Sequence, residues 1–300
     1  MEQVILDNMR SKLLERTNID TLPASTWKHI AALNTWGTNA IEGSTITRKD
    51  AEKILVEDKT PTGKPMRDVL ETIQHERAFR GLLQRRKIDI TLESILELHD
   101  EVFRLILPDA GQWRRINGRI KGADFTPPRM EKVINEMEKW VSDYRQRDVE
   151  GENVFILGSW MHYEFERIHP FSDGNGRVGR LLLNQHFLSR NWPPVHILPV
   201  HREDYLYGLR EALKGNFNSL INFLRIIMGS SLLDLLNIVG TNEDRLISLK
   251  EASQLSPYSE KYLALRCKAG EIPSLRSGRE WRTSNFVLEL YMEHIGRKAD

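Results

Sequence analysis

The chain has 300 residues, which is enough for about two domains at roughly 100–200 residues each. Its 43 Lys and Arg nearly balance its 42 Asp and Glu, so the net charge is +1. A near-neutral chain lacks the broad positive field of proteins that coat nucleic acids or membrane surfaces. The single cysteine, Cys267, excludes an internal disulfide and a cysteine-rich zinc site, and it favours a cytoplasmic location.

The first residues carry interspersed charges, so they do not have the pattern of a signal peptide. Helical spacing of apolar residues dominates the N-terminal third of the chain. It predicts helices over 1–17, 47–56, 68–83 and 91–103. Thr47 with Asp50 has the pattern of a helix cap.

The pattern changes between Gly111 and Met130, where glycines and prolines interrupt it. Alternating Ile116, Gly118 and Ile120 predict a short β-hairpin in an otherwise helical chain. Further helices are predicted over 155–168 and again after residue 176. The apolar tract 220–240 contains polar and charged residues, so we expect a buried helix there and no association with a membrane.

The stretch HPFSDGNGRVGR, residues 169–180, contains glycines with the G-x-G-x-x-G spacing of a dinucleotide-binding loop. A dinucleotide loop follows a strand, whereas the preceding segment here is helical and ends at His169-Pro170. Asp173 would also lie against a pyrophosphate unless a cation lay between them. The spacing therefore does not favour a nicotinamide or flavin enzyme.

The same stretch has the parts of a site for transfer of a phosphoryl or nucleotidyl group. Gly174-Asn175-Gly176 can turn backbone N–H groups toward an anion at a helix N-terminus. Arg177 and Arg180, three residues apart, project from one side of that helix.

Three further residues complete this set. Asp173 can hold Mg²⁺ against phosphates, and His169 can take a proton from an attacking hydroxyl. Phe171, between them, is expected to anchor the loop in the core. Each residue alone has an ordinary explanation as a turn, a cap or a solvated side chain, but one twelve-residue stretch supplies them all.

This stretch resembles, at every defining position, the Fic (Fido) motif His-x-Phe-x-(Asp/Glu)-Gly-Asn-Gly-Arg-x-x-Arg. The resemblance extends over roughly residues 20–235 and implies a mainly α fold, a helical bundle with a short β-hairpin flap. It predicts an N-terminal helical region over 1–90, a catalytic core over 91–235 and a separate domain over 246–300.

The resemblance implies a protein adenylyltransferase that moves AMP from MgATP to a Ser, Thr or Tyr hydroxyl of a target protein or of itself. His169 would be the general base and Asp173 the Mg²⁺ ligand. The implied nucleotide-binding residues are Gly174, Asn175, Gly176, Arg177 and Arg180, with Tyr205 as a candidate for the adenine side that could equally belong to the core. The flap would take an extended segment of an unknown target by strand addition.

A second motif lies near the N-terminus, where Thr38, Glu42 and Gly43 match the inhibitory pattern (Ser/Thr)-x-x-x-Glu-(Gly/Asn) of the family. The same residues also suit an ordinary helix end. The resemblance implies that Glu42 pairs with Arg180 and so excludes a productive ATP pose. In some relatives this glutamate orients a water that removes AMP, and the sequence leaves that alternative open.

Residues 246–300 are expected to form two short helices and a hairpin, which resembles a winged helix-turn-helix. Such a module binds DNA or mediates contacts between protein chains, as in a homodimer. The chain could therefore be a DNA-binding regulator controlled by self-modification. Transfer of a group other than AMP is a third alternative.

Overall fold

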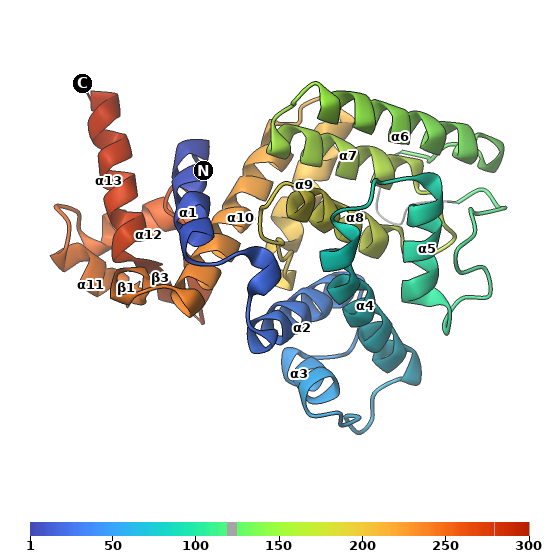
Figure 1. Ribbon diagram of the computed structural model, residues 1–300, viewed down its shortest axis with the longest axis horizontal. Helices are drawn as coiled ribbons and strands as arrows, with labels where there is room; N and C mark the ends of the chain where they lie inside the picture. The colour runs from blue at the N-terminus through green and yellow to red at the C-terminus, as the bar shows by residue number, and fades with distance from the viewer. Residues whose placement is uncertain (119–124, 279, 300) are drawn as a thin grey trace. The chain divides into compact units, whose positions relative to one another are not determined.

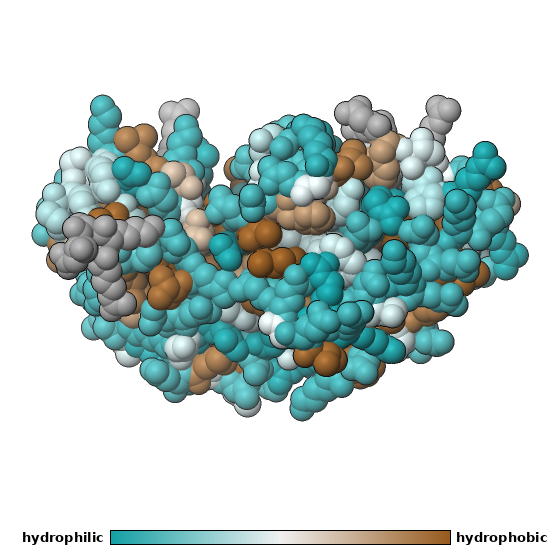
Figure 2. All heavy atoms as spheres, turned by 90° about the horizontal axis from the view of Figure 1, so that it is seen from above, coloured by the Kyte–Doolittle hydropathy of each residue, from teal (hydrophilic) through white to brown (hydrophobic). Residues whose placement is uncertain are grey.

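The computed structural model describes residues 1–118, 125–278 and 280–299, and the protein is mainly helical (Figure 1). The chain forms two compact units. One comprises Pro23–Ile221, and the other combines Met1–Leu22 with Asn222–Asp300. Hydrophilic side chains cover most of the face drawn in Figure 2.

The unit Pro23–Ile221 is a bundle in which α7 packs against α6 and α8, and α4 packs against α2, α5 and α8. Its helices are α2 (Ala24–Ile41), α3 (Arg48–Val56), α4 (Met66–Arg85), α5 (Leu92–Phe103), α6 (Val133–Val149), α7 (Val154–Ile168), α8 (Asn175–Ser189) and α9 (Arg202–Leu213), with 3₁₀ turns η2 (Met130–Lys132) and η3 (Pro199–His201).

Local sequence explains where these helices begin and which face they bury. Thr47 and Asp50 form the predicted capping box at the start of α3. The predicted apolar stripe of α7 is in the core, with Leu157, Met161 and Phe165 all 0% exposed. The central helix of the bundle is therefore held by the 3.6-residue period that is visible in the sequence.

The other unit contains a small antiparallel sheet with strand order β1-β3-β2. Its elements are α1 (Gln3–Arg16), η1 (Ile19–Thr21), most of α10 (Asn218–Val239), η4 (Asn242–Asp244), β1 (Leu246–Ser248), α11 (Leu249–Gln254), α12 (Glu260–Lys268), β2 (Leu275–Ser277), β3 (Glu280–Ser284) and α13 (Asn285–Ala299). Leu246 faces Ser284, and Leu275 faces Arg282. Two short helices followed by a hairpin were expected, whereas β1 and α13 were not.

Helix α1 belongs to this second unit, although the sequence suggested one N-terminal region over 1–90. The carboxylate of Asp244 is 0% exposed and pairs with Arg16, and its other oxygen lies 3.4 Å from Lys12 Nζ. Sequence patterning could not foresee this placement, because it reports which face of α1 is apolar and not which partner covers it.

Helix α10 contains the apolar tract that we expected to be a buried helix. Among the described helices it is the one long and apolar enough to cross a membrane by length and composition alone. In the protein, 61% of its most apolar window is buried. A core helix passes the same test, so the composition of α10 carries no further conclusion.

The predicted flap is only partly described. Residues 111–118 and 125–130 contain no strand, so within these ranges the expected hairpin is absent. Ile116 is 65% exposed. Ile120 lies outside the described residues.

Candidate active site

Helix α7 ends at His169, whose backbone adopts the left-handed conformation with φ 52°. The His169 Nδ1 atom lies 3.3 Å from the carbonyl oxygen of Glu166, and a carbonyl can only accept, so Nδ1 carries the proton. Burial lowers the pKa of His169, against a raising effect of that hydrogen bond. The imidazole is therefore neutral near pH 7, with the lone pair on Nε2 left to accept a proton.

A buried amide braces the loop between α7 and α8. The Asn175 side chain accepts a hydrogen bond from the Phe171 N–H at 2.8 Å and donates one to the Phe171 carbonyl at 2.9 Å. Phe171 is 1% exposed and stacks on the ring of His99 with a centroid distance of 3.7 Å. Because the Asn175 amide is used in this way, any contact of Asn175 with a phosphate would come from its backbone N–H.

Two glycines of the turn leave space that no other residue could leave. Gly174 caps α8 with φ 83°, and a Cβ there would lie 2.2 Å from the ring of Phe103. A Cβ on Gly176 would lie 2.4 Å from Glu42 Oε1. The backbone at the start of α8 is therefore bare on the side that faces Glu42, as an anion-binding helix N-terminus requires.

The carboxylate of Asp173 is half-exposed and paired. It accepts a hydrogen bond from Arg67 at 2.7 Å and lies 3.5 Å from Arg177. Its other bond is with the Gly174 N–H at 2.6 Å. Among the described residues no cluster of three or more metal-ligating side chains occurs, so a metal here would take one protein carboxylate and several other ligands. That donor set suits Mg²⁺ held together with phosphates.

Arg177 is buried rather than solvated. It is 3% exposed, its Nη1 lies 2.8 Å from Glu71 Oε2, and its guanidinium lies 4.5 Å from the centre of the Phe103 ring. Glu71, on α4, also accepts a hydrogen bond from Arg67 at 2.9 Å. The arginine thus has a fixed position beside the glycine turn.

Arg180 meets the Thr38–Gly43 motif directly. Its Nη2 donates to Glu42 Oε1 at 2.7 Å, and its Nε donates to the Thr38 hydroxyl at 2.5 Å. Partial desolvation alone would raise the pKa of Glu42, but the charges of Arg180 and Arg177 outweigh it and lower the pKa. Glu42 is therefore an ionised counter-ion of Arg180. Gly43, at φ 92°, ends the turn after α2.

Tyr205, the weaker nucleotide-binding candidate, is 2% exposed on α9. Its hydroxyl lies 2.7 Å from Nε2 of the buried His162. This position agrees better with the alternative that Tyr205 belongs to the core.

Two residues near the site had not been singled out from the sequence. Arg114, 3% exposed, donates from Nε to the His169 carbonyl at 2.8 Å and from its backbone to the Pro170 carbonyl at 2.9 Å. His99 accepts from the Gly111 N–H at 2.9 Å and donates from Nε2 to the Asp173 carbonyl at 3.1 Å. Neither residue lies in a motif, and nothing in a sequence distinguishes a buried arginine from its solvated neighbours.

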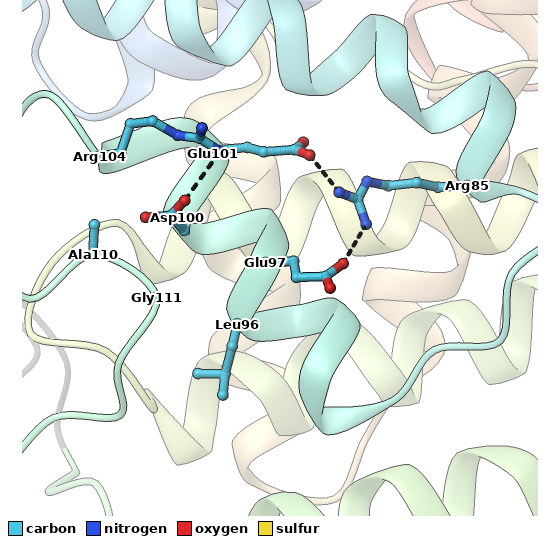
Figure 3. A pocket seen from close by; sticks show the side chains of 8 residues that line it. All are labelled: Arg85, Leu96, Glu97, Asp100, Glu101, Arg104, Ala110 and Gly111. Carbon is cyan, nitrogen blue, oxygen red and sulfur yellow. Dashed lines mark hydrogen bonds and ion pairs between the residues drawn. The ribbon is translucent and has the colours of Figure 1, made fainter.

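A pocket of about 390 Å³ lies beside α5 and includes none of the motif residues. Figure 3 shows its charged lining paired internally, with Arg85 bridging Glu97 and Glu101, and Arg104 bound to Asp100 at 3.0 Å. The site at the α7–α8 turn is therefore defined by its chemistry and not by the size of a cavity.

Comparison with known proteins agrees with this geometry. The model of the Fic/DOC family matches residues 89–187. Protein adenylyltransferase fic-1 of Caenorhabditis elegans is 30% identical over 251 residues, which cover 79% of this chain and 48% of that protein. Protein adenylyltransferase Fic of Nematostella vectensis is 28% identical over 237 residues, covering 75% and 54%. The chain thus spans about half the length of these relatives.

Solved structures have the same fold. A fragment of Fic-1 from C. elegans superposes with a TM-score of 0.68 at 26% identity and covers 77% of this chain and 69% of that one. A Fic domain containing signalling protein from Bacteroides thetaiotaomicron gives 0.69 at 22% identity, covering 77% and 95%. The family model and these neighbours agree that the chain contains a Fic/DOC domain over residues 89–187 and has the Fic fold.

Proposed function

We propose that this protein transfers AMP from MgATP to a Ser, Thr or Tyr hydroxyl of a target protein or of itself and releases pyrophosphate. The observation that carries the proposal is the neutral His169, with Nε2 available, next to a bare helix N-terminus and two buried arginines. The names of the relatives support the same activity.

In the proposed reaction the residues of the motif have separate roles. His169 Nε2 takes the proton of the target hydroxyl, whose oxygen forms a bond to the α-phosphorus. The bond between the α-phosphorus and the bridging oxygen to the β-phosphorus breaks, and that oxygen leaves with pyrophosphate. Arg177 and Arg180 balance the charge on the leaving phosphates, and the backbone N–H groups of Asn175 and Gly176 orient them, since the Gly174 N–H is bound to Asp173.

Asp173 is the residue that would hold Mg²⁺. Bound there with the nucleotide, the ion would neutralise phosphate charge and orient the triphosphate. The two cations now near Asp173, Arg67 and Arg177, occupy the carboxylate until then.

Glu42 would inhibit the reaction from within the chain. Because Arg180 is 5% exposed and already bound by Glu42 and Thr38, the terminal phosphate of ATP would have to displace Glu42 to reach it. In this proposal MgATP binds productively only after Glu42 has left, and the flap residues Ile116 and Gly118 lie in the segment where a target would dock.

Labelled MgATP with purified protein tests the activity. We expect Glu42→Gly protein to incorporate label into itself or into a lysate protein, and Glu42→Gly/His169→Ala protein to incorporate none. Mass spectrometry of the adduct identifies AMP, and competition among nucleotides separates AMP transfer from transfer of another group. No label in Glu42→Gly protein under any nucleotide would overturn the proposal.

Removal of AMP is the alternative direction for the same site. Glu42 sits within contact distance of the space beside Gly176, where it could also orient a water. Incubating an AMP-modified protein with wild type and with Glu42→Gly separates the two, since removal needs Glu42 and transfer is inhibited by it.

A second candidate function concerns residues 246–300. Lys261 and Lys268 are exposed on helix α12, and Arg276 is exposed on the hairpin β2–β3. In this proposal the helix and the hairpin contact DNA phosphates through these cations. A gel shift at several salt concentrations tests DNA binding, and sedimentation tests a homodimer. A regulator controlled by its own modification would lose its regulation in His169→Ala.

A further inference from the structure

One buried carboxyl beside the site has no part in the proposed reaction. Glu166 lies on α7 one turn before His169, and its backbone carbonyl accepts the His169 Nδ1–H. Its Oε1 atom is buried and has no hydrogen-bond partner among the described residues. A buried acceptor without a partner is costly, so its position calls for a physical reason.

Gly179 shows where this carboxyl points. A Cβ added to Gly179 would lie 2.6 Å from Glu166 Oε1, so the oxygen lies against the α8 backbone one residue before Arg180. The last glycine of the G-x-G-x-x-G spacing therefore makes room for a carboxyl rather than for a dinucleotide. Any larger residue there would push Glu166 away from α8.

Charged and titratable groups from four helices surround Glu166. Arg180 on α8 lowers its pKa, Glu42 at the end of α2 raises it, and the buried His162 and Tyr205 lie on α7 and α9. Burial alone would lower the pKa of Arg180, but Glu42 and Glu166 are both among the groups that raise it. Arg180 thus has Glu42 in direct contact at 2.7 Å, while the Glu166 carboxyl lies buried against the α8 backbone next to it, with no hydrogen-bond partner on Oε1 among the described residues.

We propose that Glu166 is a positioning residue for Arg180, a second carboxyl that shares the guanidinium with Glu42 and takes up a proton from solvent when a triphosphate binds there. The proposal rests on the proposed role of Arg180 as a phosphate ligand. An ionised Glu166 offsets the charge of Arg180, so it weakens the hold of Arg180 on any other anion. A protonated Glu166 leaves the full charge for the phosphate.

The pH range in which Glu166 gains and loses its proton is close to neutrality. Burial raises the pKa of Glu166 to about 7, against the lowering effect of Arg180. Anion binding at Arg180 is therefore expected to weaken as the pH rises through about 7. A glutamine at position 166 keeps the shape and removes the titration.

The first test needs no nucleotide. The carboxyl carbon of Glu166 is titrated by ¹³C NMR in wild type and in Glu42→Gln, which removes one charge and keeps the size. We expect a Glu166 pKa well above that of surface glutamates, and a fall of roughly half a unit or more in Glu42→Gln, because a like charge has gone. An ordinary or unchanged pKa would overturn the sharing of Arg180.

The second test measures MgATP affinity by calorimetry at about pH 6 and about pH 8, where the linked proton changes the dissociation constant by up to about tenfold. Glu42→Gly protein should bind more weakly at the higher pH, and Glu42→Gly/Glu166→Gln should lose most of that difference. The matched control is Glu164→Gln in the same background, because Glu164 lies on the same helix but pairs with Arg167.

The outcomes of the two tests are separable. Equal pH dependence with and without Glu166 would overturn the positioning role. Absence of MgATP binding in every variant would count against the proposed function, while the NMR titration would still decide whether Glu42 and Glu166 share Arg180.

Discussion

Two buried ion pairs connect early residues to later ones, one in each unit, and they are built in opposite ways. In the unit that contains α1, the carboxylate of Asp244 is 0% exposed and its cations Lys12 and Arg16 are 15% and 20% exposed. At the α7–α8 turn the cation is buried, with the Arg180 side chain 6% exposed, and its partner Glu42 is 40% exposed.

The exposed partner is the one that can be exchanged. An anion from solution can replace Glu42 on the buried Arg180, whereas only a cation could replace Lys12 or Arg16 on Asp244. Because removing either partner of a buried pair leaves an uncompensated charge, the buried side is fixed in both places. Similar contacts thus make a structural clamp in one unit and, in the proposed function, the place where an anionic ligand binds in the other.

The largest effect is expected from a variant that tests whether the Glu42–Arg180 pair lies in a reaction site. In the Glu42→Gly background, His169→Ala should reduce AMP transfer by about 10²–10⁴-fold, the usual contribution of a general base. Incorporation of labelled AMP measures the rate, and circular dichroism controls for folding. A rate within a few-fold of the parent would remove His169 from the proposed reaction.

Removing Glu42 from its pair with Arg180 should have the next largest effect on the rate of AMP transfer. Glu42→Gly is expected to increase self-modification about tenfold or more, since an ion pair with a charge-assisted hydrogen bond is lost from the competing state. Intact-mass spectrometry over time gives the rate. If wild type and Glu42→Gly accumulate equal adduct, Glu42 does not inhibit this protein.

Breaking the clamp of Asp244 with Lys12 and Arg16 should change the stability of the protein and not the reaction rate. Asp244→Asn removes the buried carboxylate and leaves Lys12 and Arg16 with only the half-exposed Glu243. We expect about 1–3 kcal/mol less free energy of unfolding, measured in urea. Glu42→Gln should change it by less, because Glu42 is half-exposed. A larger loss from Glu42→Gln than from Asp244→Asn would contradict the distinction between the two contacts.

The smallest effect is a pH dependence of opposite sign at the two carboxyls around Arg180. The pKa of Glu42 is lowered, so its contribution to stability is present above about 4.5 and is lost as the pH falls further. The pKa of Glu166 is raised, so its contribution is present below about 4.5 and is lost as the pH rises through about 7. Between about pH 4.5 and about pH 7, the melting temperature should fall less steeply with rising pH in Glu166→Gln than in wild type. Identical melting profiles would argue against the raised pKa of Glu166.

Local features of the fold and of the candidate site could be predicted from the sequence, whereas contacts between distant helices could not. The period of apolar residues predicted α7, and the capping pattern predicted the start of α3, because both are local. The Fic motif likewise placed His169, Asp173 and Arg180 around the loop between α7 and α8, because all three lie within one short segment of the chain.

Contacts between distant helices were harder to foresee. The pair Glu42–Arg180 was expected only through the family resemblance, and Glu71, Arg114 and Glu166 gave no signal. Their burial depends on which helices pack together, and charged residues in a helical sequence look the same whether they face solvent or a partner. The assignment of α1 to the second unit escaped prediction for the same reason.

Gly176 has a consequence for how the protein can change by mutation. Its missing side chain leaves the space into which Glu42 reaches, and the same bare backbone would receive a phosphate. A substitution there cannot relieve inhibition and keep the substrate, since both occupy the same few ångströms. A single substitution that relieves inhibition is therefore expected at Glu42 and not at Gly176. A compound that fills this space would compete with the nucleotide and with the protein's own glutamate alike.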